Sequence, residues 1–334
     1  MLAMQCFHRK LGYFVPIGSN KGIYFGKRPR GLSIPVYMPC GKCRACRINK
    51  ANEWALRCYH ESLYTADDCC LTLTYDNEHL PSNLSVVKED VQNFLKRVRR
   101  YLDYHGLSPL RAYMAVGEYG KARHRPHYHL ILFGWKPDDL IFFKKSNSGE
   151  DMYNSAVLSS LWPYGFSVVQ ECSVKSAAYV ARYSKKMICS DCDTAEPPFC
   201  LTSRNIRLTN GEQGALGAQF LLDFVGYNGL NLPYFTIDGQ RKYPIPRYYL
   251  KLLERWYPEE RKAIIEMKRQ YLQGDMSSAT DGYVLAYVGE TREAVHIDGH
   301  QLSAEECEYW TKRLLEAEEF QSGCMLRLTR PLEF

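Results

Sequence analysis

The chain has 334 residues, of which 46% are hydrophobic and 24% charged, so it can fill a core and is neither a disordered nor a fibrous protein. No apolar run reaches the roughly 20 residues of a membrane span, and the first residues lack the apolar centre of a secretory signal, so we expect a cytosolic protein whose thirteen cysteines are thiols or metal ligands. A net charge of +6 permits a nucleic-acid partner without requiring one.

From residue 68 onward the apolar pattern alternates between the periods of strands and helices. It predicts strands at 68–75, 111–118, 127–135 and 165–172, and helices at 84–104, 152–162 and 174–187. This β-α-β-β-α-β order, followed by a helix, is the split βαβ arrangement of ferredoxin-like α+β folds. We therefore expect an antiparallel, ferredoxin- or RRM-like sheet, with strand 127–135 central and helix 174–187 adjacent to it.

Three regions are predicted along the chain. Residues 1–60 form a cysteine-rich N-terminal arm, and residues 61–255 contain the predicted sheet. Residues 256–334 form a helical C-terminal extension, with helical patterns at 258–273 and 303–320. The sequence assigns no role to this extension.

The segment RPHYHLILFG contains a possible metal site. His127 and His129 are two apart on a predicted strand and so lie on one face, and Glu118 ends the preceding strand. Two imidazoles and a carboxylate suit Mg²⁺ or Mn²⁺ with positions left for phosphate oxygens. The alternative is a pair of ordinary, half-buried histidines. In the basic loop before them, Arg123 and Arg125 line a path for a phosphate backbone, and we expect His124 to be solvated.

The helix predicted at 174–187 carries two phenols and two cations on one face. Tyr179, Arg182, Tyr183 and Lys186 are spaced i, i+3, i+4 and i+7. Nearby cations and a metal-polarised phosphate would make attack by tyrosine on DNA feasible, leaving a 5′-phosphotyrosine and a free 3′-OH. The alternative is two packed tyrosines in a chain that has 25 of them.

The N-terminal arm contains a possible zinc site. Cys40, Cys43 and Cys46 form a C-x₂-C-x₂-C run, and Cys6 is the candidate fourth ligand, which His8 could replace. Structural zinc would fix the arm to the core. Reduced, partly buried thiols and an iron–sulfur cluster are the alternatives.

Other cysteines are assigned less specific roles. Cys189, Cys192 and Cys200 form a weaker second cluster beside the tyrosine helix, and Cys69 and Cys70 are predicted core residues.

Four segments together resemble the HUH endonucleases that initiate rolling-circle replication, and more closely the initiators of the Microviridae, especially their gokushovirus-like group. The segments are CLTLTYD at 70–76, GEYGKARHRPHYHLILFG at 117–134, AAYVARYSKK at 177–186 and PCGKCRACR at 39–47. The family pattern has a lysine three residues after each tyrosine, whereas this chain has Arg182 after the first and Lys186 after the second.

The resemblance implies a nick at the phage origin, in single-stranded or supercoiled DNA, in the cytoplasm of a host bacterium. One tyrosine would hold the 5′ end while host helicase and polymerase extend the 3′-OH, and the second would cut the regenerated origin so that the released strand is rejoined. Two alternatives stay open: a non-catalytic, zinc-containing nucleic-acid-binding protein, and a plasmid or transposon protein with the same chemistry.

Overall fold

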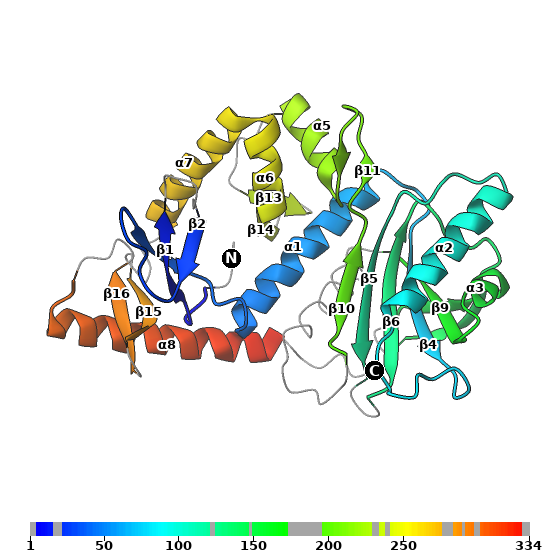
Figure 1. Ribbon diagram of the computed structural model, residues 1–334, viewed down its shortest axis with the longest axis horizontal. Helices are drawn as coiled ribbons and strands as arrows, with labels where there is room; N and C mark the ends of the chain where they lie inside the picture. Colours follow the sequence, from blue (N-terminus) through cyan, green and yellow to red (C-terminus); the bar gives the residue numbers. More distant parts are fainter. Residues whose placement is uncertain are drawn as a thin grey trace. The chain divides into compact units, whose positions relative to one another are not determined.

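The computed structural model describes residues 5–15, 22–120, 124–146, 149–172, 196–228, 234–237, 241–275, 283–288, 291–296 and 301–328 (Figure 1). The chain divides into two compact units, which we describe separately. The sheet unit comprises residues 50–262, and the cysteine unit comprises residues 3–49 and 263–332. Among the described residues, no helix has the length and apolar character needed to cross a membrane. The division into 1–60, 61–255 and 256–334 stays a prediction.

A seven-stranded sheet, antiparallel at every pairing, organises the sheet unit. In sheet order its strands are β10 (Phe199–Thr202), β5 (Ala112–Tyr119), β6 (Pro126–Phe133), β4 (Cys69–Tyr75), β9 (Gly165–Glu171), β8 (Asp151–Asn154) and β7 (Ile141–Lys145).

The central four strands have the predicted topology. Along the sheet they run β5, β6, β4, β9, which is second, third, first and fourth in chain order. That order is the one a split βαβ unit produces, because β6 inserts between β4 and β5. The predicted α+β fold class is confirmed, and β6, which carries His127 and His129, lies inside the sheet as expected.

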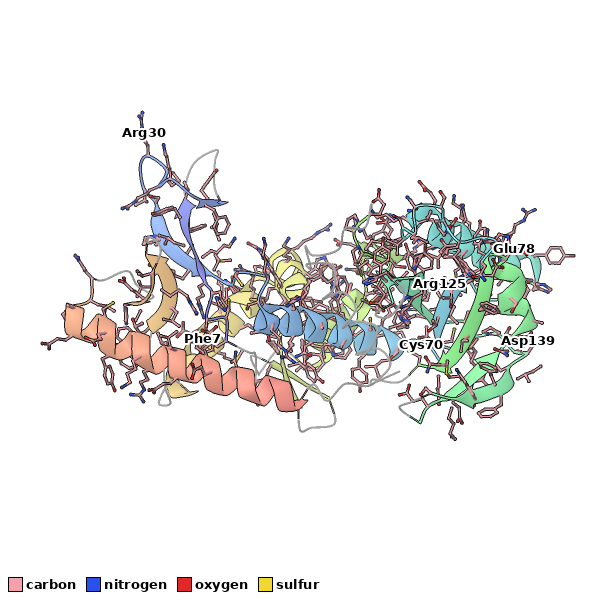
Figure 2. The ribbon with its side chains drawn as sticks, turned by 90° about the horizontal axis from the view of Figure 1, so that it is seen from below. Phe7, Arg30, Cys70, Glu78, Arg125 and Asp139 are labelled. Carbon is pink, nitrogen blue, oxygen red and sulfur yellow. The ribbon has the colours of Figure 1, made fainter. Side chains whose placement is uncertain are left out.

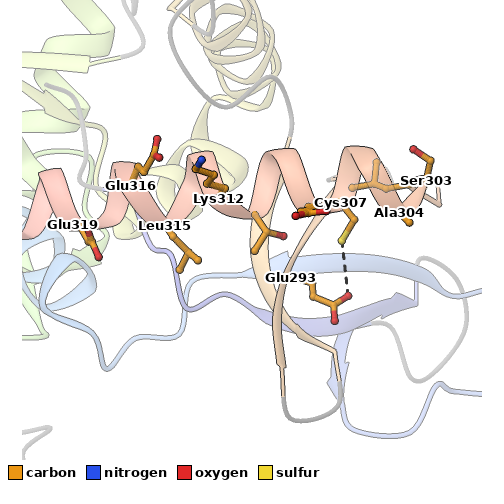
Figure 3. A pocket seen from close by; sticks show the side chains of 11 residues that line it. Glu293, Ser303, Ala304, Cys307, Lys312, Leu315, Glu316 and Glu319 are labelled. Carbon is orange, nitrogen blue, oxygen red and sulfur yellow. Dashed lines mark hydrogen bonds between the residues drawn. The ribbon is translucent and has the colours of Figure 1, made fainter.

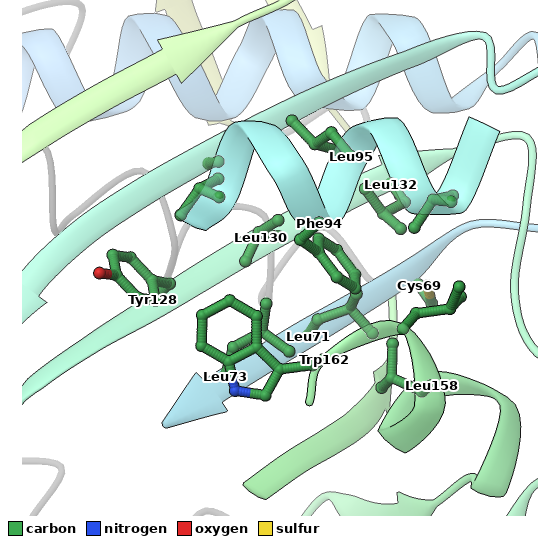
Figure 4. Packing of buried hydrophobic residues seen from close by; sticks show 14 of the residues in the cluster. Cys69, Leu71, Leu73, Phe94, Leu95, Tyr128, Leu130, Leu132, Leu158 and Trp162 are labelled. Carbon is green, nitrogen blue, oxygen red and sulfur yellow. The ribbon is translucent and has the colours of Figure 1, made fainter. Parts of the chain in front are cut away.

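Helices α2 (Lys88–Tyr104) and α3 (Ala156–Leu161) contribute to a core with one face of this sheet (Figure 4). The apolar residues predicted for α2 are all buried: Val91, Phe94, Leu95, Val98 and Leu102. Phe94 contacts the fully buried Trp162, whose indole N–H donates to the Thr74 carbonyl at 3.1 Å. Burying an aromatic ring of this size stabilises the fold by about 2–3 kcal/mol. Cys69 and Cys70 are buried, as predicted.

The helix predicted at 152–162 is wrong in its first half. Met152 and Tyr153 belong to β8 and pair with Gln170 and Val169 of β9. The helix starts only after Ser155, whose hydroxyl accepts the Leu158 N–H at 2.9 Å. Ladder hydrogen bonds at the side of a sheet therefore outweigh the helical pattern until an N-cap residue appears.

The rest of the sheet unit packs around the second half of α1 (Arg44–Ser62). It contains five elements and the start of a sixth: β11 (Ile206–Arg207), β12 (Gln213–Gly214), α5 (Ala218–Asn228), β13 (Tyr234–Ile237), β14 (Arg241–Pro244) and α6 (Arg247–Trp256), with the start of α7 (Pro258–Asp275) following. The buried carboxylate of Glu61 accepts hydrogen bonds from Gly217 N–H at 2.8 Å and Arg111 Nε at 2.7 Å. These bonds tie segments more than a hundred residues apart to one helix.

The cysteine unit joins the two ends of the chain. Its strands are β1 (Lys10–Val15), β2 (Gly22–Phe25), β3 (Ile34–Met38), β15 (Tyr283–Val288) and β16 (Thr291–His296), and α8 (Ala304–Leu328) lies along the last two. Phe7, Leu285, Ala294 and Leu314 are buried together. Figure 3 shows a groove of about 790 Å³ along α8, where the Cys307 thiol donates to Glu293 at 3.8 Å. The helices predicted at 258–273 and 303–320 are confirmed by α7 and α8.

Candidate metal centres

Strand register brings Glu118, His127 and His129 together. Glu118 of β5 lies directly opposite His127 of β6, and His129 is two residues further along β6. Directly opposite residues, and residues two apart on a strand, point to the same face of a sheet. The three ligand atoms lie within 4.8 Å of one another, so the chain brings its predicted ligand set to one point.

The carboxylate of Glu118 lies between the two imidazoles. Its Oε1 is 2.9 Å from His127 Nε2 and 3.4 Å from His129 Nε2. Glu118 is only 1% exposed and His129 7%, whereas His127 is half-buried. Burial of a carboxylate is costly without a positive partner, which a cation or a protonated imidazole can supply.

The other ring nitrogens of the histidines contact neighbouring oxygens. His127 Nδ1 is 3.2 Å from the carbonyl oxygen of Arg125, and His129 Nδ1 is 3.2 Å from the hydroxyl of Thr72. Such contacts fix ring orientation and direct both Nε2 atoms toward Glu118. Sequence reasoning missed Thr72. The signal was available, because Thr72 belongs to the alternating CLTLTY pattern of β4.

Tyr128, between the two histidines, points to the opposite face of the sheet. It is fully buried in the core, where its hydroxyl lies 2.7 Å from that of Tyr75 and accepts the Val87 N–H at 2.8 Å. Burial raises the pKa of Tyr128 to about 12. A neutral, buried phenol on the wrong face is not a nucleophile for this site.

The predicted nucleophile helix lies outside the described residues. Tyr179, Arg182, Tyr183 and Lys186 all fall within 173–195, as do Cys189 and Cys192, and Arg123 falls within 121–123. Their roles stay predictions. His124 is exposed in its loop, as predicted. Cys200 lies on β10, where burial raises the pKa of its thiol to about 11.

The second group consists of Cys6, Cys40, Cys43 and Cys46, whose sulfur atoms also lie within 4.8 Å of one another. Cys43 and Cys6 sulfurs are 3.7 Å apart, and those of Cys40 and Cys46 are 4.0 Å apart. Four sulfurs at the Zn–S distance of 2.3 Å from a tetrahedral ion are separated by about 3.8 Å. The spacing therefore fits a single four-coordinate ion.

Backbone amides surround these sulfurs. The N–H groups of Cys40 and Cys43 donate to Cys6 and Cys40 sulfurs at 3.3 and 3.2 Å. Hydrogen bonds from the Cys43 and Cys46 thiols lower the pKa of Cys6. The alternative ligand His8 is outside the group, because its Nε2 lies 2.8 Å from Glu318 Oε1.

The fold and the first site define a class: an α+β protein with a split βαβ sheet that carries two histidines and a carboxylate on one face. The sequence profile of the phage family described as "Replication-associated protein ORF2" matches residues 68–188. That range contains β4, the three sheet ligands and the predicted tyrosine segment.

Three phage proteins are similar over most of this chain. Replication-associated protein VP4 of Bdellovibrio phage phiMH2K is 35% identical over 270 residues, which are 78% of this chain and 81% of that protein. Replication-associated protein ORF2 of Spiroplasma virus 4 is 30% identical over 70% of this chain and 73% of its own length. Replication-associated protein ORF4 of Chlamydia phage 1 is 32% identical over 69% of this chain, but only 56% of that protein is matched.

No solved structure matches the chain. The chain belongs to the family of phage replication-associated proteins, as its motifs predicted.

Proposed function

We propose that this protein starts rolling-circle replication of a single-stranded DNA phage by nicking one DNA strand at the origin. One observation carries the proposal: strand register brings the side chains of Glu118, His127 and His129 to one point on one face of the sheet. Membership of the replication-associated family supports it.

Glu118, His127 and His129 would hold the divalent cation. A carboxylate oxygen with two imidazole nitrogens fits Mn²⁺, and Mg²⁺ with retained waters. When bound, the cation polarises the scissile phosphate and offsets charge that develops on it. The oxygens of Thr72 and Arg125 keep the two imidazoles in position.

The nucleophile is the hydroxyl of Tyr179 or Tyr183. Its oxygen forms a bond to phosphorus and gives up its proton, while the bond from phosphorus to the 3′ oxygen breaks and that oxygen takes a proton. The products are a 5′-phosphotyrosine and a 3′-OH. Arg182 and Lys186 supply positive charge on the same predicted helix face. The second tyrosine repeats the transfer at the regenerated origin, which allows the displaced strand to be rejoined.

The products also imply partners. A free 3′-OH must be extended and the old strand displaced, so the reaction needs a polymerase and a helicase, which the host supplies.

A denaturant-resistant adduct on single-stranded DNA tests the nickase. We expect the protein to form an adduct with origin DNA in Mn²⁺ or Mg²⁺, to lose it in EDTA and to regain it when Mn²⁺ is restored. The Tyr179→Phe, Tyr183→Phe double variant should form none, because both attacking oxygens are gone. Persistence of the adduct in the double variant would contradict the assignment. Tight DNA binding without any adduct would favour a non-catalytic nucleic-acid-binding protein.

We also propose that Cys6, Cys40, Cys43 and Cys46 hold structural Zn²⁺. The sulfur spacing of 3.7 to 4.0 Å and the backbone N–H groups around the sulfurs support a single ion over a larger iron–sulfur cluster. Elemental analysis should find about one zinc per chain, and visible absorption typical of iron–sulfur centres would contradict this choice.

A further inference from the structure

We propose that Phe166 is a stacking platform for one nucleobase of the DNA strand that crosses the sheet beside Glu118, His127 and His129. The choice of a single DNA strand as ligand depends on the proposed function. The placement of the ring depends only on strand register, exposure and a neighbouring cavity.

Phe166 lies in the same row of the sheet as two of the metal-binding candidates. Glu118 is opposite His127, His127 is opposite Thr74, and Thr74 is opposite Phe166. Each of these pairs points to one face. Two strand spacings separate His127 from Phe166, so their backbones are about 10 Å apart. A strand bound at the histidines therefore passes within reach of the ring.

The ring is exposed although it sits on an inner strand. Phe166 is 69% exposed, whereas Val169 on the same strand is 2% exposed. An isolated exposed phenylalanine needs no explanation. Phe166, however, also lines a cavity of about 290 Å³ together with Thr74, Tyr75, Asp76, Asn77 and Arg125. Its apolar face is thus part of a polar recess.

Arg125 connects this recess to the metal-binding candidates (Figure 2). Its Nη1 donates to Asn77 Oδ1 at 3.0 Å and its Nη2 to the Tyr75 carbonyl at 2.9 Å. Its own carbonyl oxygen is the atom 3.2 Å from His127 Nδ1. A guanidinium has five N–H donors, so a group held in this way can also contact a phosphate.

The charges in the recess orient the nucleotide. Asp76 lines the same cavity, and its Oδ1 accepts the N–H groups of Glu78 and His79 at 3.0 and 2.8 Å. A carboxylate repels phosphate, whereas Arg125 attracts it. The base therefore enters the recess over Phe166, and the backbone runs past Arg125 toward the histidines.

Glycine at position 165 allows the close approach that shapes this recess. Gly165 has φ +148°, and a Cβ there would collide with backbone atoms of Thr74 and Asp76. The Asp76 N–H donates to the Tyr164 carbonyl at 2.9 Å across the same junction. Phe166 is thus carried on backbone that is fixed against β4.

Fluorescence anisotropy with a labelled thymidine oligonucleotide of about 12 residues tests the platform. The assay uses the metal-loaded Tyr179→Phe, Tyr183→Phe chain, so that binding is measured without cleavage. Base stacking on an aromatic ring predicts that Phe166→Ala weakens binding by about 5- to 150-fold. Phe142→Ala, at a position 56% exposed on β7, is the matched control and should change binding by less than about twofold.

Phe166→Trp supplies a second readout. It should bind as tightly as phenylalanine, and its added emission, relative to the parent chain, should be quenched by the oligonucleotide. Unchanged affinity in Phe166→Ala, no quenching in Phe166→Trp, or no DNA binding by the parent chain would each overturn the platform.

The outcomes separate this inference from the nickase. Weaker binding by Phe166→Ala together with no metal-dependent adduct in the wild-type chain would keep the platform and reject the nickase. A metal-dependent adduct together with unchanged binding by Phe166→Ala would reject the platform alone.

Discussion

The two units use a metal site against very different backgrounds of packing. The sheet unit has a large core in which Phe94, Trp162 and the strands β4, β5 and β6 bury their side chains. In the described part of the cysteine unit, the buried cluster away from the sulfurs consists of Phe7, Leu285, Ala294 and Leu314. A small core leaves more of the stability to cross-links or metals. We infer that a metal at the cysteines acts on folding, and one at the sheet acts on chemistry.

The ligands agree with this division. Four thiolates fill the coordination of a tetrahedral ion and leave no position for substrate. One carboxylate and two imidazoles leave open positions, and Glu118 buries a charge that the sheet unit would be more stable without.

The largest expected effect is loss of the cysteine site. Cys43 precedes α1, and its sulfur accepts the Cys46 N–H at 3.5 Å as an N-cap does. Cys43→Ser keeps a cap but removes a zinc ligand, so we expect loss of bound zinc and of up to about 10 kcal/mol of metal-linked stability in the cysteine unit. Cys43→Ala should cost only about 1 kcal/mol more. Elemental analysis and urea unfolding measure both, and zinc retained by either variant would contradict the site.

Acid sensitivity of the sheet unit should come next in size. His60 is buried, its ring stacks on Phe220 at 3.6 Å, and its Nδ1 lies 2.9 Å from the Tyr249 hydroxyl. Burial lowers the pKa of His60 from 6.5 to about 3. Below pH 6.5 the unfolded chain takes up a proton that the folded chain refuses, so stability is fully present above pH 6.5 and falls toward pH 3. The loss attributable to His60 is at most about 5 kcal/mol.

Urea unfolding followed against pH measures this loss. His60→Gln should flatten the slope between pH 6.5 and 3, whereas the control His105→Gln, at an exposed position, should leave it unchanged. Equal slopes for the wild-type chain and His60→Gln would show that another group controls the acid response.

The smallest expected change in free energy, and the one most specific to chemistry, is at Glu118. Glu118→Gln keeps the size of the side chain but removes its charge, so we expect adduct formation to slow by about 100-fold, or about 2.7 kcal/mol, with stability unchanged or raised. Glu78→Gln, an exposed acid, is the control. A variant that loses stability but keeps its adduct rate would reverse the roles assigned to the two sites.

The sheet site was predictable because its geometry is local. A strand repeats every two residues, so the spacing of His127 and His129 fixes their common face, and the short β5–β6 connection brings Glu118 opposite. The choice between Cys6 and His8 depended on the partner Glu318, which lies more than three hundred residues away.

Long-range register is what the sequence does not contain. The approach of Phe166 to His127 requires both β4–β6 and β4–β9 pairings, which no single-segment pattern specifies. Strands β7 and β8 were missed for a related reason: β7 reads IFFKK and is exposed at every position, so it shows no alternation between a buried and a solvated face.

Strand β7 has a practical consequence for handling the protein. It ends the seven-stranded sheet, and Ile141, Phe142 and Phe143 are at least half exposed along it. An outer strand of this kind can template pairing between molecules, and Lys144 and Lys145 are the charges that oppose such self-association. Chains neutralised there should precipitate at lower concentration than the wild-type chain, and crystals of the native protein should grow best at low ionic strength, where like charges still keep these edges apart.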